Sequence, residues 1–122
     1  MLKRILIISF LLYFFPVLSH AGVQSCIEVK GFVVNVSSDG LLVVSIDHQA
    51  KIVKLAGVAY QIVNKIVDSD VRDFERKMVL NKKVRICCLG KDQLGNILGR
   101  VYFNDSCLNE ALVQAGLAKA VP

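Results

Sequence analysis

Apolar and polar residues alternate over three short stretches in the first half of the chain. Residues 28–36, 40–46 and 51–58 are rich in valine, isoleucine and leucine, which suit the pleated, half-buried surface of a β-strand. The intervening segments "SSDG" and "DHQA" carry residues that favour turns. The pattern therefore predicts three antiparallel strands joined by short turns.

The period of the pattern changes in the middle of the chain. Apolar side chains recur there about every four residues, with charged residues between them, at Ile62, Ile66, Val71, Phe74 and Met78. This spacing is typical of an amphipathic helix that packs one face on a sheet and leaves its charged face in solvent. Asp68 or Ser69 could cap the start of this helix, although the apolar stripe begins earlier.

The last third of the chain returns to alternation and then to a helical period. Residues 82–89 and 97–103 predict two more strands joined by a hairpin loop over 90–96, and residues from Leu108 predict a second helix. Residues 104–106 could cap that helix, and Gly116 reads as its stop signal. The order β-β-β-α-β-β-α, with five antiparallel strands, predicts a mainly β fold with helices, an OB-fold barrel. Such barrels often bind oligonucleotides or oligosaccharides, but the fold alone fixes no function.

The first 21 residues have the character of a targeting segment. Lys3 and Arg4 precede an apolar run over residues 5–18, and small residues at Ser19 and Ala21 suit a signal peptidase. The run is shorter than the roughly 20 residues that span a bilayer. We therefore expect a signal peptide cleaved after Ala21, a single domain over 22–122, no membrane span after processing, and a periplasmic or secreted protein. A retained anchor is the alternative.

The charge of the chain permits an anionic partner without requiring one. The formal net charge is +5, and removal of Lys3 and Arg4 leaves 13 basic and 10 acidic residues, a net charge of +3. A dedicated nucleic-acid-binding protein usually shows a denser basic stripe. Binding of single-stranded nucleic acid or another polyanion is thus expected to be weak.

Four cysteines follow the expected cleavage point, at Cys26, Cys87, Cys88 and Cys107. An even number in an exported protein favours disulfides. Cys87 and Cys88 are neighbours on a predicted strand and point to opposite faces, so they are poor partners for each other. We expect Cys26 and Cys107 each to bond one member of this pair. A zinc site is the competing interpretation, but the chain has no CxxC pair to support it.

Four segments, in order along the chain, resemble the staphylococcal-nuclease-like, or thermonuclease, family. They read "VKLAGV", "VLNKKVRI", "DQLG" and "LNEALVQAGLAKA", and the last is the most specific. The resemblance implies the OB-fold barrel and calcium-assisted phosphodiester hydrolysis. In that reaction acidic residues hold the metal, a glutamate helps to activate water, and two arginines stabilise the charge that builds on phosphate.

The residues at the family's catalytic positions differ in this chain. Asp39 keeps the first acid of the metal-binding pattern, but the second falls on Leu41. Lys54 stands at the position of the first arginine, and Asn96 at that of the second. Ala59 stands at the position of a metal-binding aspartate, and Ile62 at that of the glutamate. These changes predict that the domain is catalytically degenerate and uses no cofactor.

Three functions remain open on the sequence. The first is an exported, inactive binding module for a polyanion, with basic candidates at Lys51, Lys54, Lys91 and Arg100. The second is a structural role in which the barrel docks to an envelope protein, with candidate contacts at Tyr60, Ile62 and Tyr102. The alternative to both is an active calcium-dependent nuclease whose site is rebuilt from Asp39, Asp47, Asp92 and Arg100.

Overall fold

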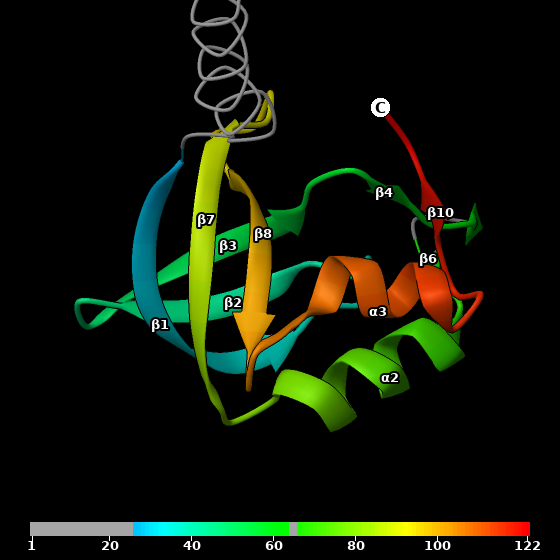
Figure 1. Ribbon diagram of the computed structural model, residues 1–122, viewed down its shortest axis with the longest axis horizontal. Helices are drawn as coiled ribbons and strands as arrows, with labels where there is room; N and C mark the ends of the chain where they lie inside the picture. The colour runs from blue at the N-terminus through cyan, green and yellow to red at the C-terminus, as the bar shows by residue number, and fades with distance from the viewer. Residues whose placement is uncertain (1–25, 64–65) are drawn as a thin grey trace, which may run out of the picture.

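Five long strands curl into a closed barrel, with two helices packed beside it (Figure 1). The computed structural model describes residues 26–63 and 66–122, so the expected signal peptide lies outside the described residues. The barrel strands are β1 (Ile27–Val36), β2 (Leu42–Ile46), β3 (Gln49–Leu55), β7 (Lys83–Lys91) and β8 (Ile97–Phe103). Short strands make up the rest: β4 (Val58–Ala59), β5 (Ile62–Val63), β6 (Ile66–Val67), β9 (Ser106–Cys107) and β10 (Lys119–Ala120). The predicted OB-fold barrel is confirmed.

The barrel closes through one pairing that the alternation pattern did not reveal. The sheet runs in the order β3-β2-β1-β7-β8-β9, and β3 also pairs with β8. This closing pair is parallel, with Val53 opposite Ile97, so the expectation that all five strands pair antiparallel is wrong at this point. Closure leaves neither β3 nor β8 as a free barrel edge. No helix in the described part of the chain is long and apolar enough to cross a membrane.

The core of the domain fills the barrel and the space under the helices. Alternate strand residues point inward and are fully or almost fully buried, among them Val33, Leu42, Val44, Val53, Ile86 and Val101. Leu108 and Leu112 of α3 (Leu108–Gln114) add the helix contribution. The apolar stripe of the sequence thus becomes the inner surface of the barrel, and the other face of each strand is left for solvent.

The helix α2 is shorter than the sequence pattern suggests. It runs over Ser69–Val79, and the Asp68 side chain caps it by accepting a hydrogen bond from the Asp70 amide at 2.9 Å. Ile62 and Ile66, which the pattern placed in the helix, lie instead in the small antiparallel pair β5–β6. Their spacing of four residues occurs in a hairpin as well as in a helix, so periodicity alone could not separate the two.

The start of α3 also differs from expectation, whereas its end does not. Cys107 is the N-cap and makes no side-chain cap hydrogen bond. Asn104 and Asp105 adopt positive φ angles of 46° and 64° in the turn before β9, so they shape that turn and do not cap the helix. Gly116, with φ of 76°, follows the helix as predicted, and its amide donates to the Val113 carbonyl.

One disulfide forms, between Cys26 and Cys87. Cys88 and Cys107 carry free thiols, so the expected second bond is wrong. The strand registers explain why. Cys107 lies opposite Tyr102, which lies opposite Arg85, and Cys88 stands three residues along β7, on the other face of the sheet.

Candidate functional site

The turn between β1 and β2 contains the positions of the family's two metal-binding acids. Ser37 closes this turn: its amide donates to the Leu41 carbonyl at 2.8 Å, and the Leu41 amide donates to its hydroxyl at 3.0 Å. The same hydroxyl donates to the Asp39 carboxylate. Asp39 is therefore bonded within its own turn, and the next acid position presents the half-buried aliphatic side chain of Leu41.

The segment after β3 places two further apolar residues where the family has acids. Ala59 is exposed on β4, opposite Lys119 of β10. Ile62 lies on β5 with 54% of its surface exposed. Between them, the Tyr60 ring covers Gly40 so closely that a Cβ on that glycine would lie 3.3 Å from the ring. The ring fills space beside the β1–β2 turn and carries no acid to it.

The two positions of the family's arginines meet at Asp92, in the β7–β8 turn. Asn96 donates to the Asp92 carboxylate from its amide, at 2.9 Å, and from its side chain, at 3.1 Å. Partial burial acts to raise the pKa of Asp92, but the hydrogen bonds from Asn96 and Leu94, together with the charge of Lys54, hold it below its ordinary value. Lys54 thus lies near an ionised carboxylate, and the hydrogen bonds of Asn96 stabilise the β7–β8 turn.

Calcium does not fit the residues at these positions. The ion takes six to eight oxygen ligands, most of them carboxylates and carbonyls. At the family's metal and base positions the side chains are Asp39, Leu41, Ala59 and Ile62, of which one bears a carboxylate. No group of three or more His, Cys, Asp or Glu residues in the described part of the chain is arranged to hold a metal ion. Asp39, Asp47 and Asp92, proposed for a rebuilt site, lie in three separate turns.

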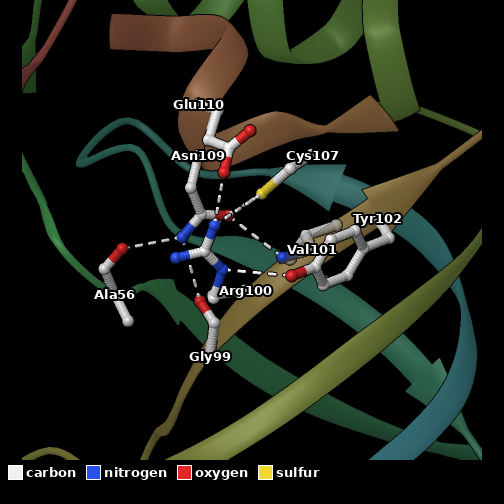
Figure 2. Close-up of polar contacts among 8 residues, drawn as sticks. All are labelled: Ala56, Gly99, Arg100, Val101, Tyr102, Cys107, Asn109 and Glu110. Atoms are coloured by element: carbon white, nitrogen blue, oxygen red, sulfur yellow. Dashed lines mark hydrogen bonds and ion pairs between the residues drawn. The ribbon is translucent and has the colours of Figure 1, made fainter. Parts of the chain in front are cut away.

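Arg100, a candidate in two of the three sequence hypotheses, is held by neighbouring side chains. Its guanidinium donates to the Glu110 carboxylate at 2.7 Å and to the Tyr102 hydroxyl at 3.1 Å, and it lies 3.8 Å from the Cys107 sulfur (Figure 2). Its side chain is 32% exposed. Arg100 therefore joins β8 to α3 and is already paired with an acid.

Asn109 explains why the "LNEAL" segment is so specific. Its side chain is buried and bonds three backbone groups, two within β8 and one just after β3 (Figure 2). The oxygen accepts from the Val101 amide at 3.0 Å, and the nitrogen donates to the Ala56 and Gly99 carbonyls at 2.7 and 3.2 Å. Sequence reasoning used the motif without finding this role, although an amide beside the buried stripe positions Leu108 and Leu112 is a signal for it.

The basic candidates divide into separate groups. Lys51 and Lys91 both line a cleft of about 350 Å³ between β3 and the β7–β8 turn. Arg100 lines a different cleft, of about 390 Å³, beside α3 and Glu110. The structure thus brings Lys51 and Lys91 together in one cleft, which Asn96 also lines. Asn96 bonds Asp92, the acid whose pKa the charge of Lys54 lowers.

A buried acid that sequence reasoning missed lies on α2. Glu75 is fully buried, and neither carboxylate oxygen has a hydrogen-bond partner among the described residues. Burial raises its pKa to about 8. The Tyr60 hydroxyl is also buried and has no hydrogen-bond partner within 26–63 and 66–122, and burial together with the charge of Glu75 raises the pKa of this tyrosine. Glu75 is one of six charged residues of α2, so the sequence pattern predicted it to be part of a solvated face.

Comparisons with known proteins agree with this architecture. Residues 45–122, from the end of β2 to the C-terminus, match the family described as staphylococcal nuclease homologue. A search of curated proteins found no match. The match spans β3, α2, β7, β8 and the α3 junction that Asn109 builds, and it covers more than half of the chain. The chain belongs to the staphylococcal nuclease homologue family.

Proposed function

We propose that the protein is an exported nuclease-like domain that binds a polyanion and does not hydrolyse it. The observation that carries the proposal is the side-chain set at the barrel end, where Leu41, Ala59 and Ile62 occupy the acid positions of the family. None of these three side chains can ligate calcium or take a proton from water, and Asp39 alone keeps a carboxylate at the family's metal positions. Lys54 keeps a charge at the first arginine position but lacks the planar fork that matches phosphate.

The size of the expected rate loss supports a non-catalytic role. Loss of a single group that stabilises transition-state charge typically costs about 10²–10³ in rate. Here every metal-binding acid except Asp39, the base and the second arginine are replaced together. Such losses are not additive within one catalytic unit, but no described residue takes over any of these tasks.

Two features support export. Residues 1–21 have the pattern of a signal peptide, which would leave a domain over 22–122. The Cys26–Cys87 disulfide suits an oxidising compartment such as the periplasm or the extracellular space. The proposed partner then binds outside the cytoplasm.

The cleft of Lys51 and Lys91 is the proposed contact for the polyanion. Both side chains lie on the exposed surface, and Asn96 lines the same cleft. Binding through such cations releases counterions, so the affinity should fall steadily as salt rises.

A nuclease assay tests the proposal directly. The oxidised chain over 22–122 is incubated with plasmid and with single-stranded DNA, in calcium or in chelator, and its melting temperature is measured in both. We expect no cleavage above buffer and no calcium-dependent rise in the melting temperature. Calcium-dependent cleavage that is lost in both Arg100→Ala and Asp47→Asn, with each variant still folded, would establish the rebuilt nuclease site instead.

A second candidate function is docking to an envelope protein, and one observation favours it. The β5–β6 pair exposes Ile62, Val63 and Ile66, which retain 54%, 62% and 49% of their surface. Of the contacts named from sequence, Ile62 is exposed, whereas Tyr60 packs on Gly40 and Tyr102 lies under Arg85. A photo-crosslinker at Ile62 should capture one envelope protein, and Val63→Ser should abolish the product; capture that survives the substitution would exclude this surface.

A further inference from the structure

A groove of about 550 Å³ lies on the outer face of the barrel, lined by residues of β1, β2, β7 and β8. It is separate from the cleft of Lys51 and Lys91, with which it shares no lining residue. The inward neighbours along these strands, such as Val33 and Ile86, are buried, so the alternate residues face outward into the groove. These outward residues are what a ligand would meet.

The strand registers gather cations and aromatic rings in this groove. Lys30 of β1 lies opposite Arg85 of β7, and Arg85 lies opposite Tyr102 of β8. Phe32 lies opposite Lys83 in the next outward-facing pair of β1 and β7. Side chains opposite one another on the same face are close neighbours, so three cations alternate with two rings across three strands.

The rings differ in what they can offer. The guanidinium of Arg85 lies 5.2 Å from the centre of the Tyr102 ring, which holds the guanidinium over that ring. Phe32 has no such cover, and 40% of its surface is exposed. An exposed phenyl ring beside a lysine is a surface on which a planar base can stack.

The charges in the groove favour an anion. Lys30, Lys83 and Arg85 line it, together with His48, against the single acid Asp47. Glu28 lies 3.5 Å from Arg85, but both side chains are about half exposed, at 50% and 45%. Exposed ion pairs of this kind contribute little, so a phosphate can replace Glu28 as the partner of Arg85.

We propose that this groove binds single-stranded nucleic acid, with backbone phosphates on Lys30, Lys83 and Arg85 and a base stacked on Phe32. A single strand fits better than a duplex, because a duplex keeps its base faces covered by neighbouring bases. The inference adds a second binding surface to the proposed function. It rests on the proposed function in one respect, that the bound strand is not hydrolysed.

Fluorescence anisotropy of a labelled oligothymidine about 12 nucleotides long, at low salt, tests the proposal on the oxidised chain. Base stacking on an aromatic residue is worth enough that Phe32→Leu should weaken binding by about ten-fold. Arg85→Gln and Lys83→Gln should each weaken binding about three-fold or more, because each removes a phosphate contact. Lys77→Gln on α2 removes the same charge outside the groove and should change the affinity less than about two-fold.

One variant should act in the opposite direction. Glu28→Gln removes the acid that competes for Arg85 and leaves the aromatic rings in place. We expect it to tighten binding about two- to three-fold. Tighter binding by Glu28→Gln, together with weaker binding by the groove variants, would not come from a change in stability.

Several results would overturn the inference. Equal affinity for an oligomer of the same length without bases, or for the matching duplex, would exclude stacking on Phe32. An equal loss in Lys77→Gln would show that only overall charge is sensed. If Lys51→Gln with Lys91→Gln abolishes binding while the groove variants bind normally, the groove is excluded and the proposed function stands. If the groove variants fail as expected but the strand is cut, the groove stands and the proposed function fails.

Discussion

The α3 junction and the barrel end after β3 have diverged in opposite ways. At the junction, Asn109 bonds three backbone groups and Arg100 pairs with Glu110, so polar residues there are satisfied. At the barrel end, apolar Ala59 and Ile62 stand exposed at positions where the family has acids. The first region holds the barrel together, and the second contains positions at which the family carries catalytic acids. The family can therefore be recognised in this chain from residues that hold its fold, although the residues at its catalytic acid positions differ.

The largest effect should come from breaking the junction. Asn109→Ala would leave the Val101 amide and the Ala56 and Gly99 carbonyls buried without partners. Each such group costs roughly 1–3 kcal/mol, so we expect the free energy of unfolding to fall by about 4 kcal/mol. Urea denaturation measures it.

The neighbouring acid provides the matched control. Glu110→Gln breaks only a partly exposed ion pair and should cost no more than about 1 kcal/mol. If Asn109→Ala were as stable as Glu110→Gln, the buried amide would not be what holds α3 to the barrel.

The next effect should come from Glu75, the buried acid of α2. Its pKa rises from an ordinary value near 4.5 to about 8 on folding, so the folded state binds the proton more tightly than the unfolded state. Stability from this group is complete below pH 4.5 and is lost as pH rises through 8. Between pH 5 and 8 the free energy of unfolding should fall by about 3 kcal/mol.

Substitution isolates that slope. Glu75→Gln cannot titrate, so its free energy of unfolding should vary less across the same pH range. Above pH 8, Glu75→Leu should have a higher free energy of unfolding than the parent protein. Glu110→Gln removes an exposed acid and should keep the parent slope. A parent profile that is flat from pH 5 to 8 would contradict the assignment.

The smallest effect should come from restoring the acids of the barrel end. The double variant Ala59→Asp with Ile62→Glu changes exposed positions, and the new aspartate faces Lys119 across the β4–β10 pair. The free energy of unfolding should change by less than about 0.5 kcal/mol. The same kind of change at buried Leu108 should abolish folding; a comparable loss in the double variant would show that the barrel end also holds the fold.

Local patterns predicted the barrel because each long strand alternates and each turn carries its own signal. They failed where a helix and a strand pair share the same spacing of apolar residues. The four-residue spacing of Ile62 and Ile66 fits a helix, but the two residues lie in the antiparallel pair β5–β6. The positions that differ from the family's catalytic residues could be identified because they align with contiguous motifs. The groove could not, because Lys30, Arg85 and Tyr102 lie far apart in sequence and only the registers of β1, β7 and β8 bring them together.

The Cys26–Cys87 bond also records how β1 lies on β7. In the observed register Glu28 stands opposite Cys87 and Ile27 opposite Cys88. A slip of one residue would turn every outward side chain of β1 inward, and would present Cys88 to Cys26 in place of Cys87. The identity of the cysteine that bonds Cys26 therefore reports the register of β1 on β7. A bond to Cys87 corresponds to the observed register, and a bond to Cys88 would indicate a shift by one residue.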